Sequence, residues 1–176
     1  LIAEPSLPWA SWTTAKLKWM AHAFQRGYQF LDEGGQYMGK MQFSNFGKKI
    51  QSELNGVVVN FKLQGVFIHK VIISDENEEE LGNIQLRLFG KSTIYLNSGE
   101  VYFWKRKNIF NTRWQIIRDL PNTDDDPISI EYQYLYRFVQ ESGEIELLEE
   151  SSQSELITLI GFFLGMYFIR QRRKQG

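Results

Sequence analysis

Apolar and polar residues alternate along most of this chain with a period of two. The alternation is clearest in residues 16–23, 57–63 and 130–138, and in the last of these one face is almost entirely aromatic. Successive side chains of a β-strand point to opposite faces, so this spacing predicts strands with one buried face. We therefore expect the body of the chain to be mainly β.

Turn signals separate these runs at short intervals. Residues 32–35 read Asp-Glu-Gly-Gly and residues 55–56 read Asn-Gly, and glycine accepts the positive φ that hairpin turns need. About eleven or twelve strands of ordinary length fit between such turns. Strands joined by short turns pair antiparallel, and so many of them form either two stacked sheets or a closed barrel.

The periodicity changes near the end of the chain. Residues 156–169 are almost wholly apolar on every side of a helix, and the basic sequence of residues 170–174 follows. Ser154 is the expected N-cap, with Glu155 in the first turn, where a carboxylate complements the helix dipole. The sequence thus predicts one central helix over residues 155–172.

A helix that is apolar all round must be surrounded by protein or by lipid. The apolar run is about 21 Å long at ~1.5 Å per residue, whereas the hydrocarbon core of a bilayer is roughly 30 Å thick. We therefore expect a core helix enclosed by strands. The alternative is a membrane segment, because the small-xxx-small spacing of residues 161–165 and the basic flank also suit a membrane helix.

Strands throughout, followed by one hydrophobic helix that ends in arginines, resemble the layout of the tubby-like fold. The stretches that carry the resemblance are residues 65–67 leading into 71–75, residues 92–100 and residues 156–161. That family includes the tubby C-terminal domain, the phospholipid scramblases and proteins resembling LURP-one. The resemblance implies a closed antiparallel barrel of about 12 strands around a C-terminal hydrophobic helix.

Composition limits both the number of domains and the kinds of chemical site that the chain can form. No repeat or change of composition divides the chain, so we expect one domain over residues 1–176, with residues 1–14 as an irregular arm. Cysteine is absent, which excludes disulfides, thiolate nucleophiles and cysteine-ligated zinc. His22 and His69 lie in separate strands, and no phosphate-binding glycine loop or nucleophile motif is present. We expect no enzymatic activity, no cofactor and no metal.

Charge provides the remaining hint. The net charge is −1, so attraction to an anionic partner must come from a local patch. Two basic segments are expected to pair as a hairpin across residues 108–112 and to bring their charges to one surface. The candidate residues for binding an anionic headgroup are Lys105, Arg106, Lys107, Arg113 and Arg118. Such a patch would bind phosphoinositide headgroups, as the tubby domain does; the alternative is a hairpin end kept free of aggregation by its charges.

These patterns lead to two hypotheses of function. The first is a non-enzymatic binding module for anionic phospholipid headgroups or for an acidic protein partner, cytoplasmic and peripheral to a membrane. The second is a membrane-anchored protein that uses the apolar helix as its membrane segment. A nucleic-acid partner is not expected at this net charge, and the oligomeric state does not follow from the sequence.

Overall fold

The computed structural model describes residues 15–21, 26–44, 48–65, 67, 69–110, 112–135 and 140–176. The elements are β1 (Lys16–Ala21), β2 (Gly27–Leu31), β3 (Tyr37–Phe43), β4 (Lys49–Leu54), β5 (Val57–Gln64), β6 (Lys70–Ser74), β7 (Glu80–Gln85), β8 (Ser92–Leu96), β9 (Val101–Arg106), β10 (Arg113–Arg118), β11 (Ile128–Leu135), β12 (Ser142–Leu147) and α1 (Ser154–Gln175).

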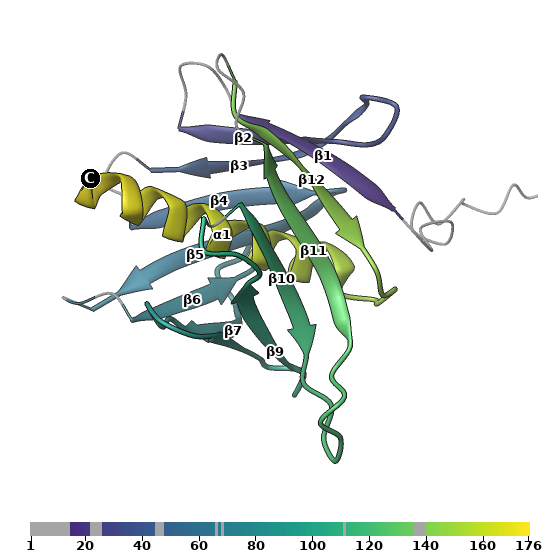
Figure 1. Ribbon diagram of the computed structural model, residues 1–176, viewed down its shortest axis with the longest axis vertical. Coiled ribbons are helices and arrows are strands. Elements are labelled where there is room, and N and C mark those ends of the chain that lie inside the picture. The colour runs from purple at the N-terminus through teal and green to yellow at the C-terminus, as the bar shows by residue number, and fades with distance from the viewer. Residues whose placement is uncertain are drawn as a thin grey trace, which may run out of the picture.

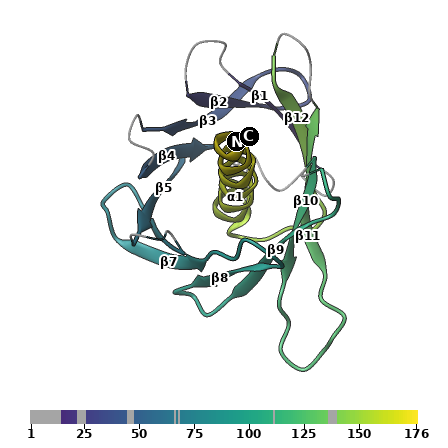
Figure 2. The same cartoon turned by 60° about the vertical axis from the view of Figure 1, so that its left-hand side comes forward.

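The strands form one closed antiparallel barrel. Each strand pairs with its neighbours in the chain, and β1 closes the ring by pairing with β12, for example Leu17 with Ile145. The helix α1 runs through the barrel, as the views across it (Figure 1) and along it (Figure 2) show. The predicted mainly β architecture, and the closed barrel in place of two stacked sheets, are confirmed.

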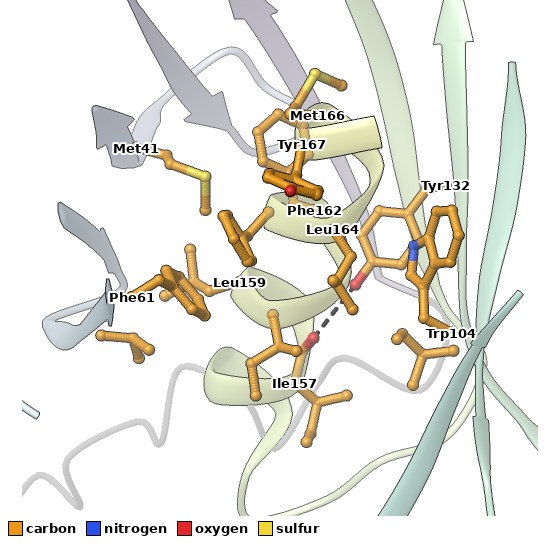
Figure 3. Packing of buried hydrophobic residues seen from close by; sticks show 14 of the residues in the cluster. Met41, Phe61, Trp104, Tyr132, Ile157, Leu159, Phe162, Leu164, Met166 and Tyr167 are labelled. Carbon is orange, nitrogen blue, oxygen red and sulfur yellow. Dashed lines mark hydrogen bonds between the residues drawn. The ribbon is translucent and has the colours of Figure 1, made fainter. Parts of the chain in front are cut away.

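The interior of the barrel is filled by α1. Every residue from Leu156 to Phe168 is buried, and each large apolar side chain taken out of water contributes about 1.5–3 kcal/mol. Figure 3 shows that helix side chains meet strand side chains on both sides, with Phe61 on one side and Trp104 on the other. Phe163 stacks on Phe61 with ring centroids 4.4 Å apart. The helix is thus the core around which the sheet closes.

Glycine sets the distance between α1 and one wall of the barrel. A Cβ on Gly161 would lie 2.2 Å from Tyr132 Oη, and a Cβ on Gly165 would lie 2.2 Å from the ring of Trp114. The two rings stack with an interplanar angle of 8°. The small-xxx-small spacing therefore accommodates aromatic side chains of β10 and β11.

The same two rings bind the backbone of the helix. Trp114 Nε1 donates to the carbonyl of Gly161 at 3.0 Å, and Tyr132 Oη donates to the carbonyl of Thr158 at 2.9 Å; its longer contact with Ile157 is drawn in Figure 3. A buried polar group that lacked such a partner would cost about 1–3 kcal/mol. These bonds fix the rotation of α1 inside the barrel.

The start and end of α1 differ from the prediction. Ser154 is the first helical residue and Gln153 occupies the N-cap position without a side-chain cap bond. The hydroxyl of Ser154 instead donates to the Ser151 carbonyl at 2.7 Å, which holds the preceding turn. The predicted N-cap was therefore wrong by one position, whereas Glu155 does lie in the first turn. The helix also continues beyond residue 172 to Gln175.

Apolar residues continue beyond the ends of two strands. Strand β6 begins at Lys70, and Phe67 before it is exposed; strand β7 ends at Gln85, and Leu88 after it is exposed. The predictions for residues 1–14, for His22 and for residues 136–138 lie outside the described residues. Within the described part, no helix combines the length and apolarity that crossing a bilayer requires.

Gly161→Ala is expected to destabilise the protein. Alanine stabilises a helix by about 1 kcal/mol relative to glycine. The added Cβ would, however, be too close to the barrel wall, and such overpacking costs about 3 kcal/mol. The expected net loss is about 2 kcal/mol in the free energy of unfolding, measured by urea denaturation with an unchanged slope. Gly34→Ala is the matched control, because its Cβ would meet nothing nearer than 3.4 Å; equal stability of Gly161→Ala and wild type would contradict the packing.

Alkaline pH is expected to unfold the barrel cooperatively. Burial raises the pKa of Tyr28, Tyr132 and Tyr167 above the ordinary value near 10. Above about pH 10 the unfolded state releases phenolic protons that the folded state retains, so the stability present below that pH falls as pH rises. Tyrosinate absorbance should therefore rise together with loss of the near-ultraviolet circular dichroism. Ionisation of all eight tyrosines with the fold intact would contradict this account.

Candidate functional site

The predicted hairpin exists, but it does not bring the candidate residues together. Strands β9 and β10 pair with Trp114 opposite Arg106 and Arg118 opposite Tyr102. Because side chains alternate across a strand, Arg106 and Arg118 share the inward parity of the buried Trp104 and Ile116. Lys105, Lys107 and Arg113 lie on the outer wall. The alternation of side chains along β9 and β10 thus places the five predicted residues on two different faces of the hairpin, and they do not form one patch.

The outer-wall cations of the hairpin lie opposite carboxylates. Lys107 Nζ is 2.7 Å from Glu131 Oε1. A shallow depression of about 250 Å³ in this wall is lined by side chains of both positive and negative charge. They are Lys16, Lys107, Arg113, Glu131, Glu144 and Glu146, together with Tyr132 and Gln133. A face in which lysine and glutamate alternate presents little net attraction to an anion.

Arg118 lies at the opposite end of the hairpin, near the start of α1. It forms an ion pair with Glu149, which also accepts a hydrogen bond from Ser129 Oγ at 2.8 Å. Its Nε is buried without a hydrogen-bond partner in the described part of the chain. Arg118 therefore ties β10 to the segment before the helix and is not positioned with the other candidates.

Arg106 lies where the C-terminal end of α1 leaves the barrel. Its guanidinium carbon is 5.1 Å from the centroid of Phe168 and 5.8 Å from that of Trp104. Burial, and then the nearby positive charge of Arg172, lower the pKa of Arg106. Among the described residues no carboxylate forms an ion pair with Arg106 or Arg172. These two arginines thus have no carboxylate partner in the described part of the chain.

The arginines of the helix are held against the barrel rim. Arg170 lies over Phe43 at 3.9 Å from the ring centroid, and its Nε donates to Tyr28 Oη at 3.3 Å. Arg173 donates to Tyr134 Oη at 2.8 Å and forms an ion pair with Glu141 at 2.6 Å. Burial and the Glu141 carboxylate raise the pKa of Tyr134 to about 12, against the opposing effect of Arg173. The basic tail is thereby fixed in place.

The connections between strands separate charge by sign. In an antiparallel barrel successive connections lie at opposite ends. Those that follow odd-numbered strands lie at the end where α1 finishes, since Arg172 Nη1 reaches the Ile109 carbonyl at 3.4 Å. With the end of the helix they carry Arg26, Lys48, Arg87, Lys91, Lys107, Arg170, Arg172, Arg173 and Lys174, and within their described part Glu141 is the one carboxylate. We call this the basic end.

The connections that follow even-numbered strands have the opposite composition. They carry Asp32, Glu33, Asp75, Glu76, Glu78, Glu79, Glu100, Asp119, Asp124, Asp125, Asp126, Glu149 and Glu150, and they contain no lysine or arginine. The connection 75–79 reaches back along the wall, where Glu78 is 3.6 Å from Lys49. This acidic end lies around the start of α1, so a chain with a net charge of −1 is strongly polarised along the barrel.

The polarity is the feature that reasoning from the sequence missed. Each run of charge, taken alone, indicates a local patch or turn, and no single run shows the separation. Assigning successive connections alternately to two ends would have revealed the separation once the strands had been counted. A helix that follows the twelfth strand and runs through the barrel then ends on the basic side.

The described residues hold no other group with an evident chemical role. No cluster of three histidine or carboxylate side chains there is suited to a metal ion. His69 is exposed, and its Nδ1 lies 2.5 Å from the Phe67 carbonyl, which is a local contact within one loop. The prediction that the chain has no enzymatic activity stays a prediction.

Comparison with known proteins identifies the fold. No protein-family model matches this chain, and no curated protein matches it by sequence. The X-ray structure of a protein from Arabidopsis thaliana is similar, with a TM-score of 0.55 and 9% sequence identity over 85% of this chain and 88% of that chain. At this identity the similarity concerns the architecture, a closed barrel with a C-terminal helix.

Proposed function

We propose that this chain is a non-enzymatic module that binds the surface of an anionic phospholipid membrane through its basic end. The observation that carries the proposal is the separation of charge between the two sets of connections. Basic residues near an anionic surface contribute about 1 kcal/mol each, and the carboxylates at the far end are repelled by the same surface. The protein would therefore bind in one orientation, at the periphery of the membrane.

The arrangement at the basic end supports a phosphate-bearing surface in particular. Arginine forms paired hydrogen bonds with phosphate oxygens. The positive charge of Arg172 lowers the pKa of Arg106, and neither arginine forms an ion pair with a carboxylate in the described part of the chain. A headgroup phosphate placed there would relieve their repulsion. The resemblance to tubby-like proteins suggests the same class of ligand, an anionic phospholipid headgroup. The sequence placed its binding residues on the β9–β10 hairpin, whereas the present proposal places binding at the basic end.

The hypothesis that α1 is itself a membrane segment is less well supported. Its apolar side chains, from Leu156 to Phe168, are covered by strands of the same chain. Exposing them to lipid would empty the barrel, whose interior they fill. We therefore propose attachment through the outer surface of the basic end, with the helix still inside.

Vesicle sedimentation tests the proposal with three variants of equal net charge. Arg172→Gln with Lys174→Gln removes two exposed cations of the basic end, Lys16→Gln with Lys18→Gln removes two from β1, and Lys105→Gln with Arg113→Gln removes two from the predicted hairpin face. At about 1 kcal/mol per cation, the first variant should bind vesicles containing phosphatidylserine about 30-fold more weakly. The Lys16→Gln, Lys18→Gln variant should remain close to wild type. The Lys105→Gln, Arg113→Gln variant should lose less than the first variant, because its residues lie on the outer wall beside the connection 107–112.

Several outcomes would contradict the proposal. Equal sedimentation of wild type with phosphatidylcholine vesicles and with vesicles containing phosphatidylserine, at low salt, would exclude an anionic surface as the ligand. A larger loss in the Lys105→Gln, Arg113→Gln variant would move the site to the hairpin face. Binding that does not weaken as the salt concentration rises would exclude an electrostatic attachment.

A further inference from the structure

The most exposed large hydrophobic side chains of the described residues all lie in three connections. Phe67 is 86% exposed, Leu88 64%, Phe89 90%, Ile109 81% and Phe110 69%. The connections are residues 65–69, 86–91 and 107–112, which follow β5, β7 and β9. All three therefore belong to the basic end. We call these five side chains the apolar crown.

The three connections are neighbours around the rim. The amide of Leu86 donates to the carbonyl of His69 at 2.8 Å, which joins the first connection to the second. Strand β8 begins at Ser92, which is opposite Trp104 on β9, so the second connection is adjacent to the third. The crown is thus one continuous arc of the rim, beside the end of α1.

The barrel itself gives no reason for these residues. The core is complete without them, because β7 ends at Gln85 and the helix already fills the interior. Surface connections are normally polar, and solvent-exposed phenylalanine promotes association. Phe67 and Phe89 are almost fully exposed and belong to separate connections, whereas the centre of a protein interface is a contiguous apolar patch.

Cations flank the apolar residues in two of the three connections of the crown. Arg87 and Lys91 enclose Leu88 and Phe89 within one connection, and Lys107 precedes Ile109. The guanidinium of Arg172 reaches the carbonyl of Ile109 itself. Apolar projections surrounded by basic residues match the boundary between acyl chains and anionic headgroups, where apolar groups enter by about 5–10 Å and cations remain at the phosphates.

We propose that the apolar crown inserts into the interfacial region of an anionic bilayer, so that the barrel stands on the membrane with α1 pointing its C-terminal end at the surface. This inference rests on the proposed function and deepens it, because it specifies that apolar side chains enter the bilayer and do not only rest on its surface. The basic residues attract the protein to the surface. The crown then supplies a contribution that salt does not screen.

Depth-dependent fluorescence tests the insertion directly. The chain contains no cysteine, so Phe89→Cys and Ile109→Cys each provide a single site for an environment-sensitive fluorophore. Val57→Cys is the control, since it is exposed on the acidic side of the barrel. With vesicles containing phosphatidylserine, the first two labels should shift to shorter wavelength and be quenched by lipids brominated on their acyl chains, whereas the label at residue 57 should do neither.

A second experiment removes the apolar groups without changing the charge. Phe89→Ser with Ile109→Ser should weaken binding to the same vesicles by about tenfold and should leave a binding component that salt abolishes. Tyr37→Ser with Leu148→Ser is the matched control at the acidic end. Both variants change exposed side chains, and circular dichroism checks that the barrel remains folded.

The outcomes separate this inference from the proposed function. Sedimentation of wild type with unshifted labels at residues 89 and 109 would overturn the insertion and leave the electrostatic attachment in place. Failure of wild type to sediment with anionic vesicles would overturn both. A shift of these labels without vesicles that grows with protein concentration would show that the crown joins two copies of this chain, and would overturn the insertion.

Discussion

The structure depends on one constraint: a helix that is apolar on every side has to be enclosed. An open sheet would cover part of α1, and only closure between β1 and β12 covers all of it. Closure in turn requires that the helix fit the diameter of the barrel. Gly161 and Gly165 provide the space on one wall, where Tyr132 and Trp114 lie directly against the helix backbone.

Antiparallel closure has a second effect, which concerns function. Because each short connection reverses the chain, successive connections lie alternately at the two ends of the barrel. The fold thereby converts a nearly neutral sequence into a body with cations and apolar projections at one end and carboxylates at the other. The helix dipole is aligned with this distribution, since its negative end lies among the arginines and its positive end near Glu149 and Glu155.

The sequence contained enough information to predict the barrel and the helix, because alternation and all-round apolarity are local properties of the chain. The candidate site needed non-local information. Lys105 and Arg106 are adjacent, yet one points to the outer wall and the other lies on the rings at the rim, and which parity faces inward follows from the packed core. Alternation alone would also extend the neighbouring strands to Phe67 and Leu88, because an apolar residue in a loop continues the pattern of the strand beside it.

The position of the core element in the chain has a consequence for biosynthesis. All strands leave the ribosome before α1 does, and β1 must wait for β12, as the pairing of Lys16 with Glu146 shows. Until the helix emerges, the nascent sheet has two unpaired edges and an unfilled apolar face, a state that invites aggregation. The barrel therefore cannot close around its core until the last element of the domain has been synthesised.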